Sequence, residues 1–189
     1  PHPVNSLFLG MVAMYALMLT FGVRPVFAII ASIAFSLSSY NLLSLAAGHN
    51  AKIWAINLIP LILLGIHLAF KKQRLLGAGV LALGLLLQLK FNHVQITYYT
   101  LIIAVIYVLV RVIFEWKKEG FAEIGKTIGF LILGAVLAVG GNIGRITTAL
   151  EYAPYSTRGN ATLETASAGL DKEYAFSWSN GKLETLTLL

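Results

Sequence analysis

The sequence contains no cysteine, a single aspartate and few charged residues of either sign. Charged side chains make up 12% of the 189 residues, whereas 58% of the residues are hydrophobic. The absence of cysteine excludes a disulfide framework and a thiolate metal site. Because Asp171 is the single aspartate and no nucleophile elbow is present, a Ser-His-Asp triad has no support. A soluble domain would need a more polar surface, so the composition indicates an integral membrane protein.

Long apolar segments account for most of the chain. Runs of about 18 or more mainly apolar residues can cross a hydrocarbon core of roughly 30 Å. The fourth such run is short, but Arg74 and Lys90 at its ends can extend it by snorkelling to the interfaces. We therefore predict an all-α, polytopic transmembrane bundle of about six spans, near residues 4–23, 26–47, 53–70, 75–89, 94–114 and 127–150.

The remaining residues are predicted to form a short C-terminal segment outside the membrane. The sequence thus divides into a transmembrane domain, 1–150, and an extracytoplasmic segment, 151–189. The chain begins at Pro1 rather than at Met and stops within a newly started apolar run. We therefore expect it to be a fragment of a larger protein.

The basic residues predict the orientation of the chain in the membrane. The net charge of +6 is not gathered in one patch of the kind that binds nucleic acid, so a nucleic-acid partner is excluded. Loops rich in Lys and Arg stay on the cytoplasmic side. Placing Arg24 and the turns at 71–74 and 111–126 in the cytoplasm puts eight of the fourteen basic residues there.

With this orientation, the other polar turns lie together on the outer side. Lysine and arginine at that level suit a phosphate or pyrophosphate group, whereas amides and tyrosines suit sugar hydroxyls. A plainer interpretation is that cations near headgroups simply meet lipid phosphate. The candidate residues are His49, Asn50, Lys52, Lys90, Asn92, His93, Gln95, Tyr98, Tyr99, Asn142, Arg145 and Glu151.

A metal site is a weaker alternative at the same level. His49 and His93 could share a divalent cation, but Glu151 and Asp171 are the only plausible third ligands. We therefore assign no metal ligands and no cofactor, and leave a divalent cation open.

Three local features bear on the helices. Pro60 should kink the third span. The pairs Gly125–Gly129 and Gly140–Gly144 are predicted to pack against neighbouring helices, and residues 140–145 to fray or unwind. His67 is predicted to be an interfacial residue rather than a ligand.

Four strings resemble the YfhO family of bacterial polytopic membrane proteins. They are Ala47-Gly-His-Asn-Ala-Lys52, Asn92-His-Val-Gln-Ile-Thr-Tyr-Tyr99, Leu150-Glu-Tyr-Ala-Pro-Tyr-Ser-Thr-Arg-Gly159, and Gly169-Leu-Asp-Lys-Glu-Tyr-Ala175 with Trp178-Ser179. The family resembles the GT-C glycosyltransferases, and the resemblance implies a partial GT-C-like helical core in the bacterial cytoplasmic membrane. Its active site would lie on the extracytoplasmic side.

The resemblance also implies an activity. The intact protein would transfer a sugar from a polyprenyl-phosphate donor to a cell-envelope acceptor, with membrane lipids around it. The catalytic carboxylate of GT-C enzymes would precede Pro1, so the fragment alone should be inactive. Lys52, Lys90 and Arg145 would bind the donor phosphate, and the other candidate residues would orient donor or acceptor. A transporter or flippase, and a non-catalytic component of envelope assembly, remain the alternatives.

Overall fold

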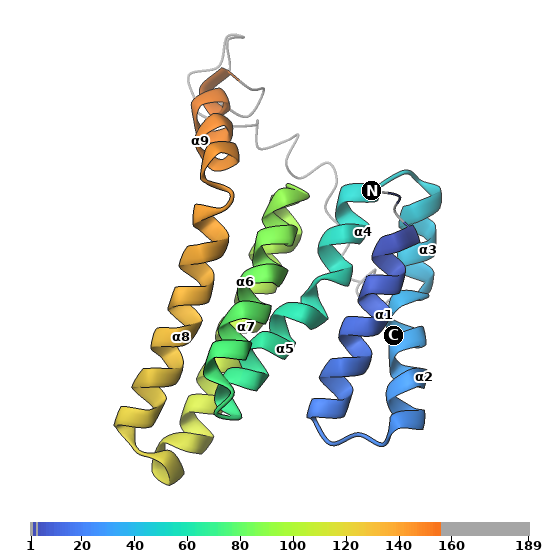
Figure 1. Cartoon of the computed structure of the whole chain (residues 1–189). Helices are drawn as coiled ribbons and strands as arrows, with labels where there is room; N and C mark the ends of the chain where they lie inside the picture. Colours follow the sequence, from blue (N-terminus) through green and yellow to red (C-terminus); the bar gives the residue numbers. More distant parts are fainter. Residues whose placement is uncertain (1, 3, 156–189) are drawn as a thin grey trace, which may run out of the picture. The chain divides into compact units, whose positions relative to one another are not determined.

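The computed structural model describes His2 and residues 4–155. This part of the chain is helical and contains no strand, which confirms the all-α prediction (Figure 1). The chain divides into two compact units, Pro1–Ile143 and Gly144–Leu189. The helices are α1 Val4–Thr20, α2 Pro25–Ser36, α3 Ser39–Ala46, α4 Asn50–Asn57, α5 Ile59–Phe70, α6 Arg74–Lys90, α7 Val94–Glu119, α8 Phe121–Gly140 and α9 Ile143–Tyr152, followed by a 3-10 turn, Ala153–Tyr155.

Four helical stretches in the described residues are long and apolar enough to cross a membrane. They are Pro25–Ala46, Asn50–Phe70, α7 and α8. The other two predicted spans correspond to α1 and α6, which have 17 residues each. At 1.5 Å per residue such a helix is about 26 Å long, slightly less than the hydrocarbon core.

Two of the long stretches are interrupted near their middle. The kink predicted at Pro60 is confirmed, because α4 ends at Asn57 and α5 begins at Ile59. The second break, between α2 and α3, was not predicted from the sequence. There the side-chain amide of Asn41 donates to the carbonyl oxygens of Phe35 and Ser36, each at 3.2 Å. This amide satisfies carbonyl groups that the interrupted helix leaves without a backbone donor.

Backbone contact between helices defines the centre of the first unit. A Cβ atom at Gly77 of α6 would lie 2.5 Å from the backbone nitrogen of Ala69 in α5. A Cβ atom at Gly134 of α8 would lie 2.7 Å from the carbonyl oxygen of Ala78 in α6. Glycine therefore lets α6 pack directly against α5 on one side and α8 on the other, as small residues do in membrane bundles.

The glycine pairs predicted to pack are not the ones in contact. Within the first unit, no described atom of another segment lies within 4 Å of a Cβ built at Gly125, Gly129 or Gly140. In α8 the buried face carries Thr127, Leu131, Gly134 and Ala138 instead. The prediction was wrong because a small-xxx-small spacing does not say which face of a helix meets its neighbour.

The sixth predicted span also had the wrong boundaries. Instead of one helix over 127–150, α8 starts at Phe121, directly after Gly120 with φ 80°, and stops at Gly140. The predicted unwinding within residues 140–145 is confirmed at Gly141 and Asn142, which separate α8 from α9. The described part of the second unit contains most of α9 and the 3-10 turn.

The turns of the first unit gather at two opposite ends (Figure 1). The His49 end contains the α3–α4 turn and the α6–α7 turn. The Glu119 end contains the α1–α2, α5–α6 and α7–α8 turns, and an ion pair between Lys72 and Glu119 joins two of them. The turns that the charge pattern assigned to one compartment therefore share one end of the unit.

Candidate functional site

Two of the predicted polar turns are joined by an aromatic stack at the His49 end. Trp54 follows the first turn and is buried, and Phe91 belongs to the second. Their ring centroids are 4.3 Å apart, with an angle of 11° between the planes. Stacked aromatic rings contribute packing energy beyond their buried area, so this pair holds the two turns together.

The first turn presents a cation at the surface beside the stack. Lys52, two residues before Trp54, is half-buried, and its Nζ lies 4.8 Å from the centroid of the Tyr40 ring. This cation–π contact orients the ammonium group without neutralising it. His49 and Asn50, at the start of α4, are exposed. Lys90, directly before Phe91, is exposed as well.

Several candidates in the second turn have local structural roles. The Nδ1 atom of His93 accepts a hydrogen bond of 3.4 Å from the backbone nitrogen of Ile96, so the imidazole caps α7. Asn92 has φ 54°, a left-handed conformation that asparagine tolerates better than most residues. These roles explain both residues without a ligand, which the sequence did not reveal.

The first turns of α7 carry an exposed amide and phenol pair. Gln95 donates a hydrogen bond of 3.2 Å from Nε2 to the hydroxyl oxygen of Tyr99. The rings of Tyr98 and Tyr99 lie 5.8 Å apart, and both are exposed. This surface offers donors, acceptors and aromatic faces of the kind that a sugar uses.

Asn142 is a structural residue rather than a free amide. Its side chain is buried, and Nδ2 donates to the carbonyl oxygen of Leu86 in α6 and to that of Ala138 in α8, each at 3.0 Å. The amide therefore satisfies a carbonyl group near the end of α8 and ties this end to α6. The donor group of Asn142 is thus committed to the two helices, and its role in orienting a ligand stays a prediction.

Arg145 and Glu151 belong to the second unit. Both lie on α9 and both are exposed. The structure thus brings together the two predicted turns of the first unit. Arg145 and Glu151 are described only within the second unit.

The predicted alternative of a metal site gains no ligand set. Among the described residues, no group of three or more His, Asp or Glu side chains could hold a metal ion. Asp171, one of the two plausible third ligands, lies outside the described residues.

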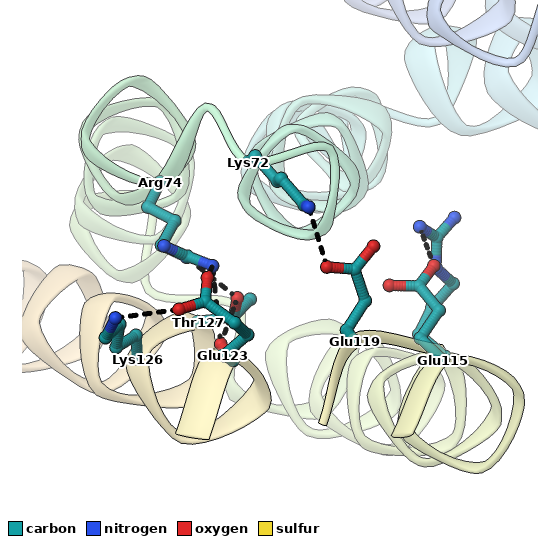
Figure 2. Close-up of polar contacts among 8 residues, drawn as sticks. Lys72, Arg74, Glu115, Glu119, Glu123, Lys126 and Thr127 are labelled. Atoms are coloured by element: carbon teal, nitrogen blue, oxygen red, sulfur yellow. Dashed lines mark hydrogen bonds and ion pairs between the residues drawn. The ribbon is translucent and has the colours of Figure 1, made fainter. Parts of the chain in front are cut away.

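The Glu119 end carries an ion-pair network that was not predicted from the sequence (Figure 2). Lys72 pairs with Glu119 at 2.8 Å, and this hydrogen bond and charge raise the pKa of Lys72. Arg74 pairs with Glu123 at 2.6 Å and donates from Nε to the Thr127 hydroxyl at 3.1 Å. The four-residue spacing of the glutamates, opposite a basic turn, was the available signal.

His67 lies at the same end and is buried among helices of the first unit. Its side chain is 4% exposed, and Nε2 lies 3.2 Å from the carbonyl oxygen of Thr20. Nδ1 lies 2.6 Å from the Tyr107 hydroxyl and 3.3 Å from Arg111. His67 therefore joins α1, α5 and α7, an arrangement that needs long-range packing and so was invisible in the sequence.

A buried glutamine forms the second polar junction, nearer to the His49 end. Gln88 is fully buried, and Nε2 donates to the carbonyl oxygen of Ala55 at 2.8 Å and to the Thr100 hydroxyl at 3.0 Å. It thus links α6 to α4 and α7. A lone amide inside an apolar run was the available signal for such an interhelical bond.

Comparison with known proteins identifies no family for this chain. No family model matches it, and neither the curated proteins nor the solved structures include a significant match. The resemblance to the YfhO family therefore stays a prediction.

Proposed function

We propose that this chain is the membrane part of a YfhO-like protein. That protein would take a sugar from a polyprenyl-phosphate donor and transfer it to a cell-envelope acceptor. The observation that carries the proposal is the Trp54–Phe91 stack, which holds the turn of Lys52 beside the turn of Lys90. Two basic turns with neighbouring amides and tyrosines match a ligand that combines phosphate and sugar.

The proposal includes six membrane crossings. Helix α6 joins the Glu119 end, where Arg74 pairs with Glu123, to the His49 end, where Phe91 stacks on Trp54. In the proposal α6 crosses as well, since it connects these ends beside the long stretches α4–α5 and α8. Helix α1 ends at Thr20, which accepts a hydrogen bond from Lys71 at the Glu119 end. We place the Glu119 end in the bacterial cytoplasm because it is rich in lysine and arginine.

Within this proposal the described residues bind the donor rather than perform the chemistry. Lys52 and Lys90 contact the phosphate. His49, Asn50, Gln95, Tyr98 and Tyr99 orient the sugar or the acceptor, and a divalent cation bound with the ligand is compatible with this arrangement. The glutamates described in the first unit, Glu115, Glu119 and Glu123, cluster at the opposite end. An acid or base for glycosyl transfer would therefore have to come from elsewhere.

The position of these glutamates favours one second candidate. Without a carboxylate from the described first unit at the His49 end, the same surface would serve a non-catalytic component that binds a lipid-linked sugar for envelope assembly. Both candidates require phosphate recognition at Lys52. The two candidates differ in whether they transfer the sugar, and not in whether they bind the donor.

Binding is therefore the measurement that tests the shared step. The whole chain in nanodiscs should bind a radiolabelled polyprenyl-phosphate sugar, and Lys52→Ala should weaken binding about tenfold, since charge-assisted hydrogen bonds contribute about 1.5 kcal/mol or more. Lys117→Ala, an exposed lysine at the other end, is the matched control and should leave the affinity unchanged.

Two results would overturn the proposal. One is a folded wild-type chain that does not bind the labelled donor. The other is an equal loss of affinity in the Lys52 and Lys117 variants, which would indicate attraction by net charge alone. Transfer of label to an envelope extract, measured with the intact protein rather than with this chain alone, would separate the transferase from the non-catalytic component.

A further inference from the structure

An apolar groove runs between α7 and the rest of the first unit. Its volume is about 230 Å³, larger than the cavity of about 150 Å³ that holds a benzene molecule in an engineered protein. Its floor is formed by buried side chains such as Ile62, Leu81 and Leu131, and its rim by the exposed Leu101, Val105 and Leu109. The groove is thus lined by apolar atoms and bordered by side chains that face outward.

Polar contacts hold α7 to the bundle on both sides of this groove. Toward the His49 end, Thr100 accepts a hydrogen bond from Gln88. Toward the Glu119 end, Tyr107 contacts His67. The two contact residues are seven positions apart, or about 10 Å of helix, and between them α7 buries Ala104 alone. The groove therefore begins between two fixed points of α7 and continues past Tyr107 to Val108 and Leu109.

The face of α7 that lines the groove continues toward the Glu119 end. Ala104, Val108 and Arg111 follow each other at spacings of four and three residues and so share one face. The guanidinium of Arg111 lies 5.3 Å from the centroid of the Phe70 ring in α5. Phe70 also lines the small cavity between Lys72, Arg74 and the glutamates. The groove thus leads toward the charged cluster.

The charge of this end is positive. The turn at 70–74 and the hairpin at 111–126 contain seven basic and three acidic residues. The three glutamates are paired with Arg111, Lys72, Arg74 and Lys126. Lys117 and Lys118 are exposed and form no ion pair in the described residues. Such a surface attracts anionic headgroups at about 1 kcal/mol per cation.

We propose that the groove is a binding site for an anionic phospholipid. One acyl chain lies between Gln88 and His67 along α7, and the phosphate lies at the Glu119 end beside Arg111 and Lys118. Lys118 follows Arg111 by seven residues and lies on the same helix face, whereas Lys117 lies on another. The site is separate from the sugar-phosphate site proposed at the His49 end.

Native mass spectrometry of the whole chain tests this site. The protein is reconstituted in nanodiscs of equal parts phosphatidylglycerol and phosphatidylcholine with identical acyl chains, then released, and the retained lipid is identified. Wild type should retain phosphatidylglycerol. Ala104→Leu, which fills the groove, should reduce retention about tenfold, because overpacking a filled site costs on the order of 1–3 kcal/mol.

Matched variants control for each part of the site. Ala34→Leu adds the same methyl groups at an exposed position of α2 and should retain the lipid. Ala135→Leu, from the α8 side of the groove, repeats the filling if Ala104→Leu lowers the helical circular dichroism. Lys118→Gln should lower the preference for phosphatidylglycerol over phosphatidylcholine, whereas Lys117→Gln should not.

Three results would overturn the proposal. They are equal retention of the two lipids by wild type, equal loss in the Ala34 and Ala104 variants, and a dimer mass that disappears with Ala104→Leu. The last result would show that a second copy of the chain, rather than a lipid, fills the groove.

Discussion

The hydroxyl of Tyr107 lies 2.6 Å from Nδ1 of His67, and Arg111 approaches the same nitrogen at 3.3 Å. A guanidinium can only donate hydrogen bonds, so Nδ1 must be an acceptor. The proton of the neutral imidazole is then on Nε2, which lies 3.2 Å from the carbonyl oxygen of Thr20. The three neighbours thus select one tautomer and order the junction of α1, α5 and α7.

This junction gives the first prediction. The nitrogen chemical shifts of labelled His67 should show the Nε2–H tautomer, and Tyr107→Phe should lower the free energy of unfolding by about 1 kcal/mol, since one buried hydrogen bond is lost. Thermal unfolding in detergent measures the second effect. Tyr98→Phe, on the exposed side of the same helix, should leave stability unchanged. An Nδ1–H tautomer would contradict the arrangement.

A second prediction compares two glycines of α6. Gly77→Ala should destabilise the protein by roughly 1–3 kcal/mol, because the new Cβ meets the backbone of Ala69 and forces α5 and α6 apart. Gly79→Ala adds the same methyl group where no described atom lies within 4 Å. It should be neutral or stabilise the helix by about 0.5–1 kcal/mol. Similar melting temperatures for both variants would mean that the α5–α6 contact is looser than described.

A third prediction ranks two of the ion pairs at the Glu119 end. The Arg74 side chain is 18% exposed and contacts both Glu123 and Thr127, whereas the Lys72 side chain is 62% exposed and contacts Glu119. Arg74→Ala should therefore lower the melting temperature more than Lys72→Ala, because exposed pairs contribute little. Raising the salt concentration should reduce the effect of Lys72→Ala on the melting temperature before it reduces that of Arg74→Ala.

The Lys72 pair also has an expected pH dependence. Because the folded protein raises the pKa of Lys72, the pair contributes fully at neutral pH and is lost when alkaline pH rises through that raised pKa. The melting curves of wild type and Lys72→Ala should therefore converge at a pH above that raised pKa. A difference that persisted above the raised pKa would point to packing rather than charge.

The fourth prediction separates structure from binding at the His49 end. Asn142→Ala should lower stability by about 1 kcal/mol through loss of its bonds to Leu86 and Ala138, and leave donor affinity unchanged. Asn92→Gly preserves the left-handed turn and should leave stability unchanged. Reduced donor affinity of a folded Asn142→Ala protein would restore the ligand role assigned from the sequence.

The local order of the chain follows from the sequence. Apolar runs bounded by basic turns predicted most helices to within a few residues, because backbone groups in lipid must be satisfied within a helix. Pro60 and the glycine-rich stretch before Arg145 predicted two of the helix interruptions, because proline and glycine disfavour a helix wherever they occur. The turns carrying Lys52 and Lys90 were likewise visible as polar sequence between apolar segments.

Tertiary structure decided which faces and side chains meet. Spacing alone chose Gly125 and Gly129 for packing, whereas the rotation of α8 presents Gly134 to Ala78. The sequence did not reveal that His67 and Asn142 are buried and bonded to partners from helices distant along the chain. The hydrophobic pattern of a helix determines which of its side chains can be buried. Which neighbouring helix covers them depends on contacts between distant segments of the chain. The same contacts determine whether a polar side chain is free to bind a ligand or is used to hold the fold together.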